Sequence, residues 1–140
     1  MATIEESIRN HLVGDADVSP LVGSRIYPTM ALKGKGCPNL VFRQTGQDEE
    51  TTARTPEGNL IGPIFTFMAS AESPAAAKAI MQAVRRSFKN FCGVMGGGVY
   101  VSGIESLSGL IDDAVIKDDT VLFFTTEADV QIWYQEVPHT

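Results

Sequence analysis

Residues 121–134, VLFFTTEADVQIWY, carry the strongest structural signal in this chain of 140 residues. Two sets of side chains alternate along the whole segment. A period of two predicts one long β-strand with a buried face and a largely polar face. The set predicted to be buried comprises Leu122, Phe124, Thr126, Ala128, Val130 and Ile132, and the opposite set comprises Phe123, Thr125, Glu127, Asp129, Gln131 and Trp133.

Shorter stretches upstream show similar strand patterns. Leu40 and Phe42 share one face of the first, and Phe65 and Phe67 share one face of the second. These first two strands are expected to pair antiparallel with each other, and the last two strands along the chain are expected to do the same. A weakly patterned region leaves open a short strand or a bulged extension. The three strands are residues 39–45, 61–70 and 99–104, and the weakly patterned region is residues 105–119.

Two segments have helical periodicity and helix-start signals. Thr3 is a predicted cap for a first helix that ends at Gly14 and has an apolar stripe. Ser73 and Pro74 open a second helix, which is predicted to run to about Phe91. Its apolar stripe packs into the core. The two stripes comprise Ile4, Ile8 and Leu12, and Ala77, Ile80, Met81, Val84, Phe88 and Phe91.

The opposite face of the second helix is basic. It suits an anion or a partner protein, but a solvated face whose late cations complement the helix dipole is the favoured interpretation. The face comprises Lys78, Gln82, Arg85, Arg86 and Lys89.

Together these elements predict an α+β fold. A small, mainly antiparallel sheet is expected to carry two amphipathic helices on one face, in two layers. Residues 1–140 are expected to form one domain. Residues 46–59 contain no large apolar side chain and are predicted to form a long polar loop within that domain.

The charge balance is acidic, with 17 Asp and Glu against 11 Lys and Arg and a formal net charge of −6. Proteins that bind nucleic acid depend on basic surface to neutralise phosphates, so specific DNA or RNA binding is not expected. An acidic surface instead lets nucleic acid pass without sticking. No segment approaches the roughly 20 apolar residues of a membrane span, and the N-terminus lacks the features of a secretory signal. We therefore expect a cytoplasmic protein with no membrane partner.

The sequence lacks the short motifs of common enzyme classes. There is no Gly-x-Ser-x-Gly, His-Glu-x-x-His or Cys-x-x-Cys, and each His and Cys stands alone. We therefore predict no catalytic residue, no cofactor and no metal site. The acidic pairs at 112–113 and 118–119 lack the spacing of a calcium loop and are expected to form solvated turns.

Several stretches together resemble one family of viral proteins. They are VSPLVGSRIYP (18–28), the strand LVFR (40–43) after Pro38, the strand FTFMA (65–69) before the helix at Ser73, and VQIWY (130–134). The chain resembles the tail-completion, or tail-terminator, family of long-tailed bacteriophages and prophages. The most specific piece comprises Leu21, Val22, Gly23, Arg25, Ile26, Tyr27 and Pro28.

This resemblance implies a structural virion protein rather than an enzyme. Members assemble as a ring, usually of six copies, that caps the tail tube, ends its polymerisation and joins tail to head. The implied partners are other copies of the chain, the tail tube protein and head–tail connector proteins, with DNA passing through unbound. The implied location is the tail or neck of the virion, after assembly in the cytoplasm of the host bacterium.

Two sets of charged residues are candidate sites for such a role. The first is a docking loop within 46–59. Two interpretations of this loop are weighed equally: a segment that becomes ordered against the tube, and a hairpin tip with no docking role. The second is an acidic lining of the ring's bore, which would repel DNA and keep it sliding. The docking set comprises Asp48, Glu49, Glu50, Arg54 and Glu57, and the bore set comprises Asp112, Asp113, Asp118 and Asp119.

Other functions stay open at this level. A head-completion or connector-adaptor subunit of the neck would differ only in which surface meets the tube. A small cytosolic ligand-binding domain or enzyme would need a pocket with converging polar groups. A nucleic-acid module built on Arg85, Arg86 and Lys89 is disfavoured by the acidic net charge.

Overall fold

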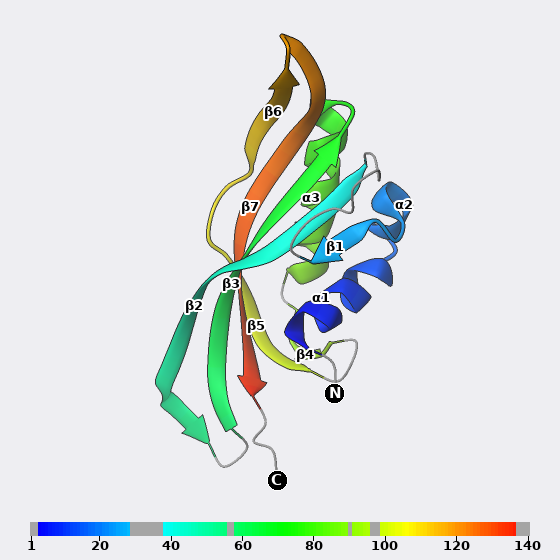
Figure 1. Ribbon diagram of the computed structural model, residues 1–140. Coiled ribbons are helices and arrows are strands. Elements are labelled where there is room, and N and C mark those ends of the chain that lie inside the picture. The colour runs from blue at the N-terminus through cyan, green and yellow to red at the C-terminus, as the bar shows by residue number, and fades with distance from the viewer. Residues whose placement is uncertain (1–2, 29–37, 56–57, 90, 96–98, 137–140) are drawn as a thin grey trace.

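The computed structural model describes residues 3–28, 38–55, 58–89, 91–95 and 99–136 (Figure 1). In chain order its elements are α1 (Ile4–Val13), α2 (Ser19–Val22), β1 (Ile26–Pro28), β2 (Asn39–Thr55), β3 (Gly58–Ala71), α3 (Pro74–Phe88), β4 (Gly93–Val94), β5 (Tyr100–Ser106), β6 (Ile111–Lys117) and β7 (Thr120–Glu136).

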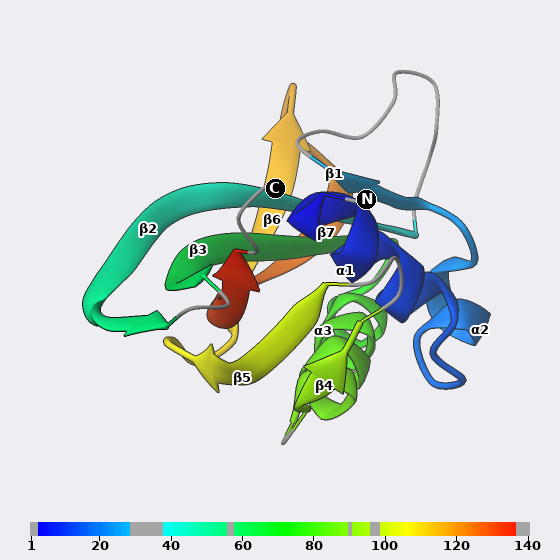
Figure 2. The ribbon, with the colours of Figure 1, turned by 90° about the horizontal axis from the view of Figure 1, so that it is seen from below.

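The strands form one seven-stranded sheet in the order β1-β2-β3-β7-β5-β4, with β6 also paired to β7. β1 runs parallel to β2, and the other strand pairs are antiparallel. The prediction of an α+β fold with a mainly antiparallel sheet is therefore confirmed. Figure 2 shows how strongly this sheet curls from β2 round to β5.

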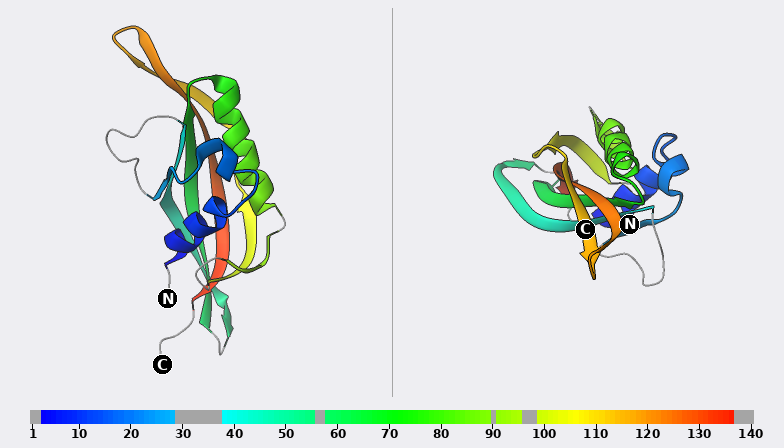
Figure 3. Two further views of the ribbon diagram at one scale, coloured as in Figure 1. Left: turned by 90° about the vertical axis from the view of Figure 1, so that its right-hand side faces the viewer. Right: turned by 90° about the horizontal axis from the view of Figure 1, so that it is seen from above.

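Helices α1 and α3 lie on the same face of the sheet (Figure 3). Both predicted apolar stripes are buried in one core cluster with the inward side chains of β2, β3 and β7, except for Phe91, which is partly buried and packs against the cluster. Thr3 and Ser73 cap the helices as predicted, since their hydroxyls accept hydrogen bonds from the backbone N–H groups of Glu6 and Ala76. α3 ends at Phe88 rather than Phe91 because Lys89 adopts extended backbone, with ψ at 123°.

Aromatic rings occupy the centre of this core. Phe42, Phe65 and Phe67 are fully buried, and the Phe42 and Phe67 rings stack with centroids 5.3 Å apart. Phe67 also meets Phe88 of α3 edge to face, at 5.5 Å between ring centroids. These contacts fix the helix layer to the middle of the sheet.

The strand predicted from residues 121–134 is present as β7, which is the central strand of the sheet. Ala128, Val130 and Ile132 are buried beneath the helices, as the alternation predicted. The prediction was wrong for Leu122, which is 52% exposed because β3 stops at Ala71, opposite Phe124. The opposite face is polar but partly covered. On it, the Thr66 hydroxyl donates to Asp129 Oδ1 at 2.6 Å, and buried Gln131 donates through Nε2 to the Gly62 carbonyl at 2.9 Å.

Residues 46–59 were predicted to form a loop, but the described residues of this segment, 46–55 and 58–59, belong to the outer ends of two paired strands. The segment 46–50 of β2 pairs with 60–64 of β3, and Thr55 pairs with Gly58. The loop prediction was wrong because β7 pairs with β3 as far out as Asn59, opposite Glu136, and β2 follows β3. We call the segment 46–59 the outer hairpin; Glu57 and residue 56 lie outside the described residues.

One glycine in β3 is required by its neighbour. A Cβ atom at Gly62 would lie 2.6 Å from Cε3 and Cζ3 of Trp133, inside van der Waals contact. We expect Gly62→Ala to lower the free energy of unfolding by about 1–3 kcal/mol, the usual cost of overpacking. Urea denaturation measures this loss.

Gly103 of β5 provides a matched control for that substitution. It is also a strand glycine, but a Cβ atom there would meet nothing within 4 Å. Gly103→Ala is therefore expected to leave stability nearly unchanged. Equal losses in the two variants would contradict the packing of Trp133 against Gly62.

Candidate interaction surfaces

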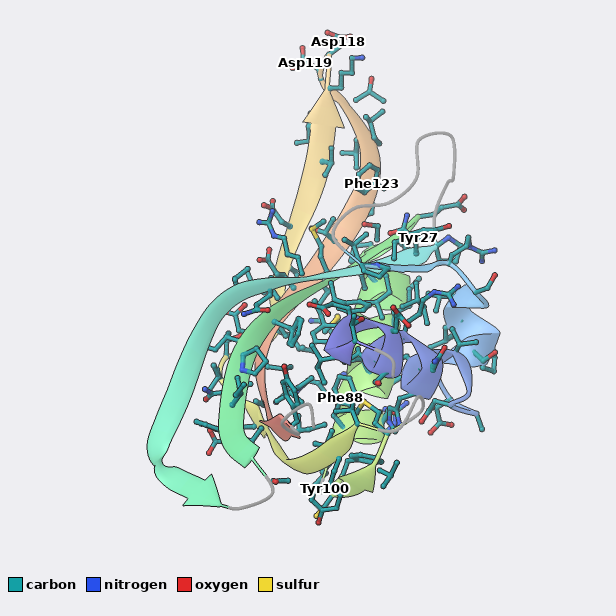
Figure 4. All side chains as sticks on the ribbon, turned by 60° about the horizontal axis from the view of Figure 1, so that its bottom comes forward. Tyr27, Phe88, Tyr100, Asp118, Asp119 and Phe123 are labelled. Atoms are coloured by element: carbon teal, nitrogen blue, oxygen red, sulfur yellow. The ribbon has the colours of Figure 1, made fainter. Side chains whose placement is uncertain are left out.

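The most specific part of the family-like motif is a structural connector. Val22 and Ile26 are fully buried, and Gly23 has a positive φ of 59° that favours glycine. Arg25 Nε donates to the Pro38 carbonyl at 2.7 Å, and Arg9 of α1 donates to the carbonyls of Ser24 and Ile26. The remaining motif residues lie on the same short run of α2 and β1. Tyr27 is labelled in Figure 4.

A β-hairpin projects from the body at one end of the sheet. We call it the arm; it comprises β6, Asp118–Asp119 and the first part of β7, residues 120–123. Within the described residues β3 stops at Ala71, opposite Phe124, so the outer arm strands pair only with each other. Figure 1 shows the arm extending beyond the rest of the sheet.

The tip of the arm is a two-residue turn. Asp118 and Asp119 have φ values of 53° and 60°. Hairpin turns of the primed type require positive φ at both central residues, and Asp tolerates this conformation. The prediction of a solvated turn is confirmed for this pair and wrong for Asp112 and Asp113, which lie on strand β6.

All four acidic bore candidates therefore lie on the arm, but they do not form one cluster. Asp112 lies at its base and receives 2.9 Å contacts from Lys78 Nζ of α3 and from the Thr126 hydroxyl. Asp113 Oδ1 accepts from the Ala114 backbone N–H at 2.7 Å. Asp118 and Asp119 point away at the tip (Figure 4).

The contact between Lys78 and Asp112 predicts a pH dependence. The hydrogen bond from Lys78, with that from Thr126, lowers the pKa of Asp112 below its ordinary value of 3.8. A lowered folded-state pKa stabilises the fold above the unfolded value, and this contribution is lost as pH falls through the folded value. Because both side chains are solvent-exposed, Asp112→Asn is expected to lower the melting temperature only slightly at pH 7.

The same difference should disappear as the pH falls through the lowered pKa of Asp112, because the wild-type carboxylate is then protonated. Thermal scans of both proteins across this range test the expectation. Asp113→Asn is the control, because Asp113 is not paired with Lys78. A difference for Asp112→Asn that stays constant even after the wild-type carboxylate has been protonated would contradict the assignment.

The arm also exposes large apolar side chains. Five of the eight exposed large hydrophobic residues in the described part of the chain lie on it. Ile116 and Leu122 are 62% and 52% exposed. Cross-strand pairing puts Val115 beside Phe123 and Ile116 beside Val121, with a register shift between the two pairs. Monomeric proteins rarely expose such apolar groups together unless they mark an interaction site. The five residues are Ile111, Val115, Ile116, Val121 and Leu122.

A pocket lies away from the arm, between the second half of α3 and strands β5 and β7. Its volume is about 600 Å³. Its floor is apolar, with Phe88, Ile104 and Val130, and its rim is basic. We call it the basic pocket. The polar residues that line it are Gln82, Arg85, Arg86, Lys89 and Ser106.

The docking candidates of the outer hairpin lie at the opposite end of the sheet from the arm (Figure 1). The backbone of 48–50 pairs regularly with β3, and the pairing becomes irregular between Glu50 and Thr55. Arg54 lies in this irregular stretch. In the described part of the chain, docking candidates and bore candidates are therefore not brought together.

His11 of α1 is a packing residue. Its ring stacks on Phe88 with centroids 5.7 Å apart and meets Phe91 edge to face. Its Nε2 lies 2.9 Å from the Ser87 hydroxyl. Within the described residues no three His, Cys, Asp or Glu side chains gather as a metal site requires. In the same part of the chain no helix is long and apolar enough to cross a membrane.

Sequence reasoning missed the arm and the pocket as surfaces. The signal for the arm was present, since two β-branched stretches flank Asp118–Asp119, a pattern typical of a two-residue hairpin. The basic rim was visible as one face of a helix. The apolar floor of the pocket was not visible in the sequence, because it is formed by residues from α3, β5 and β7.

Comparison with known proteins adds evidence on the fold. No protein-family model and no curated protein matches the sequence. Among solved structures, a chain from the virion of a native gene transfer agent (GTA) particle matches with a TM-score of 0.66. The match covers 95% of each chain, at 18% sequence identity. The protein thus shares its fold over almost its entire length with a component of that virion particle.

Proposed function

We propose that this protein is a structural subunit of a phage-like virion, and that it forms a ring at the end of a tail tube. The observation that carries the proposal is the match to a chain of the gene transfer agent virion, over 95% of both chains. Ring formation needs two different surfaces on each subunit, so that contacts run head to tail and close. The arm and the basic pocket supply two such surfaces.

In this role the ring caps the tube, ends its growth and presents its other side to the head connector. This finer assignment rests on the resemblance of residues 21–28 to the tail-terminator family. The outer hairpin is the part proposed to meet the tube, since it projects from the end of the sheet opposite the arm. The formal charge of −6 suits a ring that DNA crosses without binding.

The experiment is to add the purified protein to polymerising tube protein from the same particle and to image the tubes by negative stain. We expect short tubes with a ring at one end, and the images give the number of copies. Bovine serum albumin at the same concentration is the control for unspecific effects. Tubes that grow unchanged and carry no ring would refute the capping role. Binding to the head connector alone would instead identify a connector-adaptor subunit.

A further inference from the structure

We propose that the arm of one copy of this chain inserts into the basic pocket of the next copy. The proposal deepens the ring function above by naming the contact between its subunits. It commits to one occupant of the pocket: the apolar, acidic-tipped hairpin of a second, identical chain.

The arm by itself has no further strand to pair with its outer residues within the described part of the chain. A two-stranded hairpin is marginally stable in water. Ile116 and Leu122 nevertheless expose more than half of their surface. Burial of such side chains is favourable in proportion to the apolar surface that it removes from water. The arm therefore gains stability if an apolar pocket covers it.

The charges of the arm and of the basic pocket are complementary. The arm carries four Asp residues against one lysine, Lys117. Asp112 is already paired with Lys78, which leaves Asp113 and the tip pair, Asp118 and Asp119. The pocket rim carries Arg85, Arg86 and Lys89 around an apolar floor. Thus an apolar hairpin with an acidic tip matches an apolar floor with a basic rim.

The outer edge of strand β5 lies beside the pocket. β4 pairs with β5 only at Tyr100 and Val101, so in the described part of the chain no strand covers the outer edge of β5 at residues 102–106. Ile104 and Ser106 of this same stretch line the pocket. A hairpin that enters there can add its backbone hydrogen bonds to that edge.

The contact must form between copies. The tip of the arm lies far from Phe88 on the pocket floor and points away from the body (Figure 4). Two different surfaces that fit each other on identical chains make a head-to-tail contact, which closes as a ring or continues as a filament. The inference assigns Asp118 and Asp119 to this contact rather than to the lining of a bore.

Disulfide trapping between two differently tagged chains tests the proposal, and it also captures weak contacts. Both chains carry Cys37→Ser and Cys92→Ser. One adds Ile116→Cys on the arm, and the other adds Lys89→Cys on the pocket rim. Mild oxidation is expected to give the mixed disulfide dimer in several-fold higher yield than a control pair in which Val94→Cys replaces Lys89→Cys. Val94 is 67% exposed and lies outside the pocket.

A second variant tests the role of charge. Arg85→Glu combined with Arg86→Glu on the pocket chain is expected to reduce the yield to that of the control pair. Circular dichroism verifies that this variant is folded. A mixed dimer no more abundant than the control overturns the proposal, as does a predominant arm-to-arm dimer of the Ile116→Cys chain. Because the assay contains no tube protein, its failure is distinguishable from failure of the capping role.

Discussion

An alanine in place of Phe67 is expected to lower the free energy of unfolding by about 3–5 kcal/mol. Phe67 is fully buried and touches the rings of Phe42 and Phe65 in the sheet and of Phe88 in α3. The substitution removes these contacts and leaves a cavity at the junction of the two layers. Such a loss is a large part of the 5–15 kcal/mol that stabilises a typical domain. Urea denaturation with an unchanged m-value measures it.

Phe123→Ala is the control for this prediction. It makes the same chemical change in β7, but Phe123 lies on the arm and is only half-buried. Its loss is expected to be clearly smaller. Equal losses for the two variants would mean that the aromatic cluster does not join the helices to the sheet in solution.

Shortening the outer hairpin is expected to abolish capping of tail tubes with little change in stability. The variant deletes residues 51–57 and joins Glu50 directly to Gly58. Glu50 pairs with Leu60, so Gly58 and Asn59 become a two-residue connection between paired strands. Glycine suits the first position of such a turn. The body of the sheet therefore keeps its register while the part proposed to meet the tube is removed.

The measured quantity is the fraction of capped tube ends, which we expect to fall about tenfold or more, equivalent to at least 1.4 kcal/mol of binding free energy. A full-length variant with Arg54→Ala and Glu57→Ala separates the effect of charge from that of length. If the shortened protein caps tubes as well as the full chain, the outer hairpin has no docking role and is an uninvolved tip.

The sequence predicted the elements whose pattern is local. The alternation in 121–134 identified the central strand, and Ser73 with Pro74 identified the start of α3. The parallel strand β1 was not predicted, because three residues show no period and their pairing with 40–42 is a long-range contact. The extended outer hairpin was not predicted either. Its polar composition favours a loop, and only its neighbours in the sheet hold it extended.

The candidate surfaces were less accessible from sequence than the fold. Residues 105–119 left a strand open without showing that Ile116 would be uncovered. The prediction that Leu122 is buried was wrong, since its side chain is 52% exposed. The exposure of these side chains depends on the end of β3 at Ala71, which cannot be predicted from the sequence of the arm. The pocket similarly depends on the approach of Phe88 to Ile104 and Val130, from three different elements.

The length of β7 has a mechanical consequence. Its 17 residues form one uninterrupted strand of about 55 Å, from the tip of the arm to the end beside the outer hairpin. Hydrogen bonds between antiparallel strands lie perpendicular to the strand axis. Because these bonds lie across the direction of the pull, a pull applied between the two ends of β7 loads the covalent backbone of this strand rather than its hydrogen bonds to β3. Force arriving at either end is carried across the molecule by a single covalent strand, without passing through a loop.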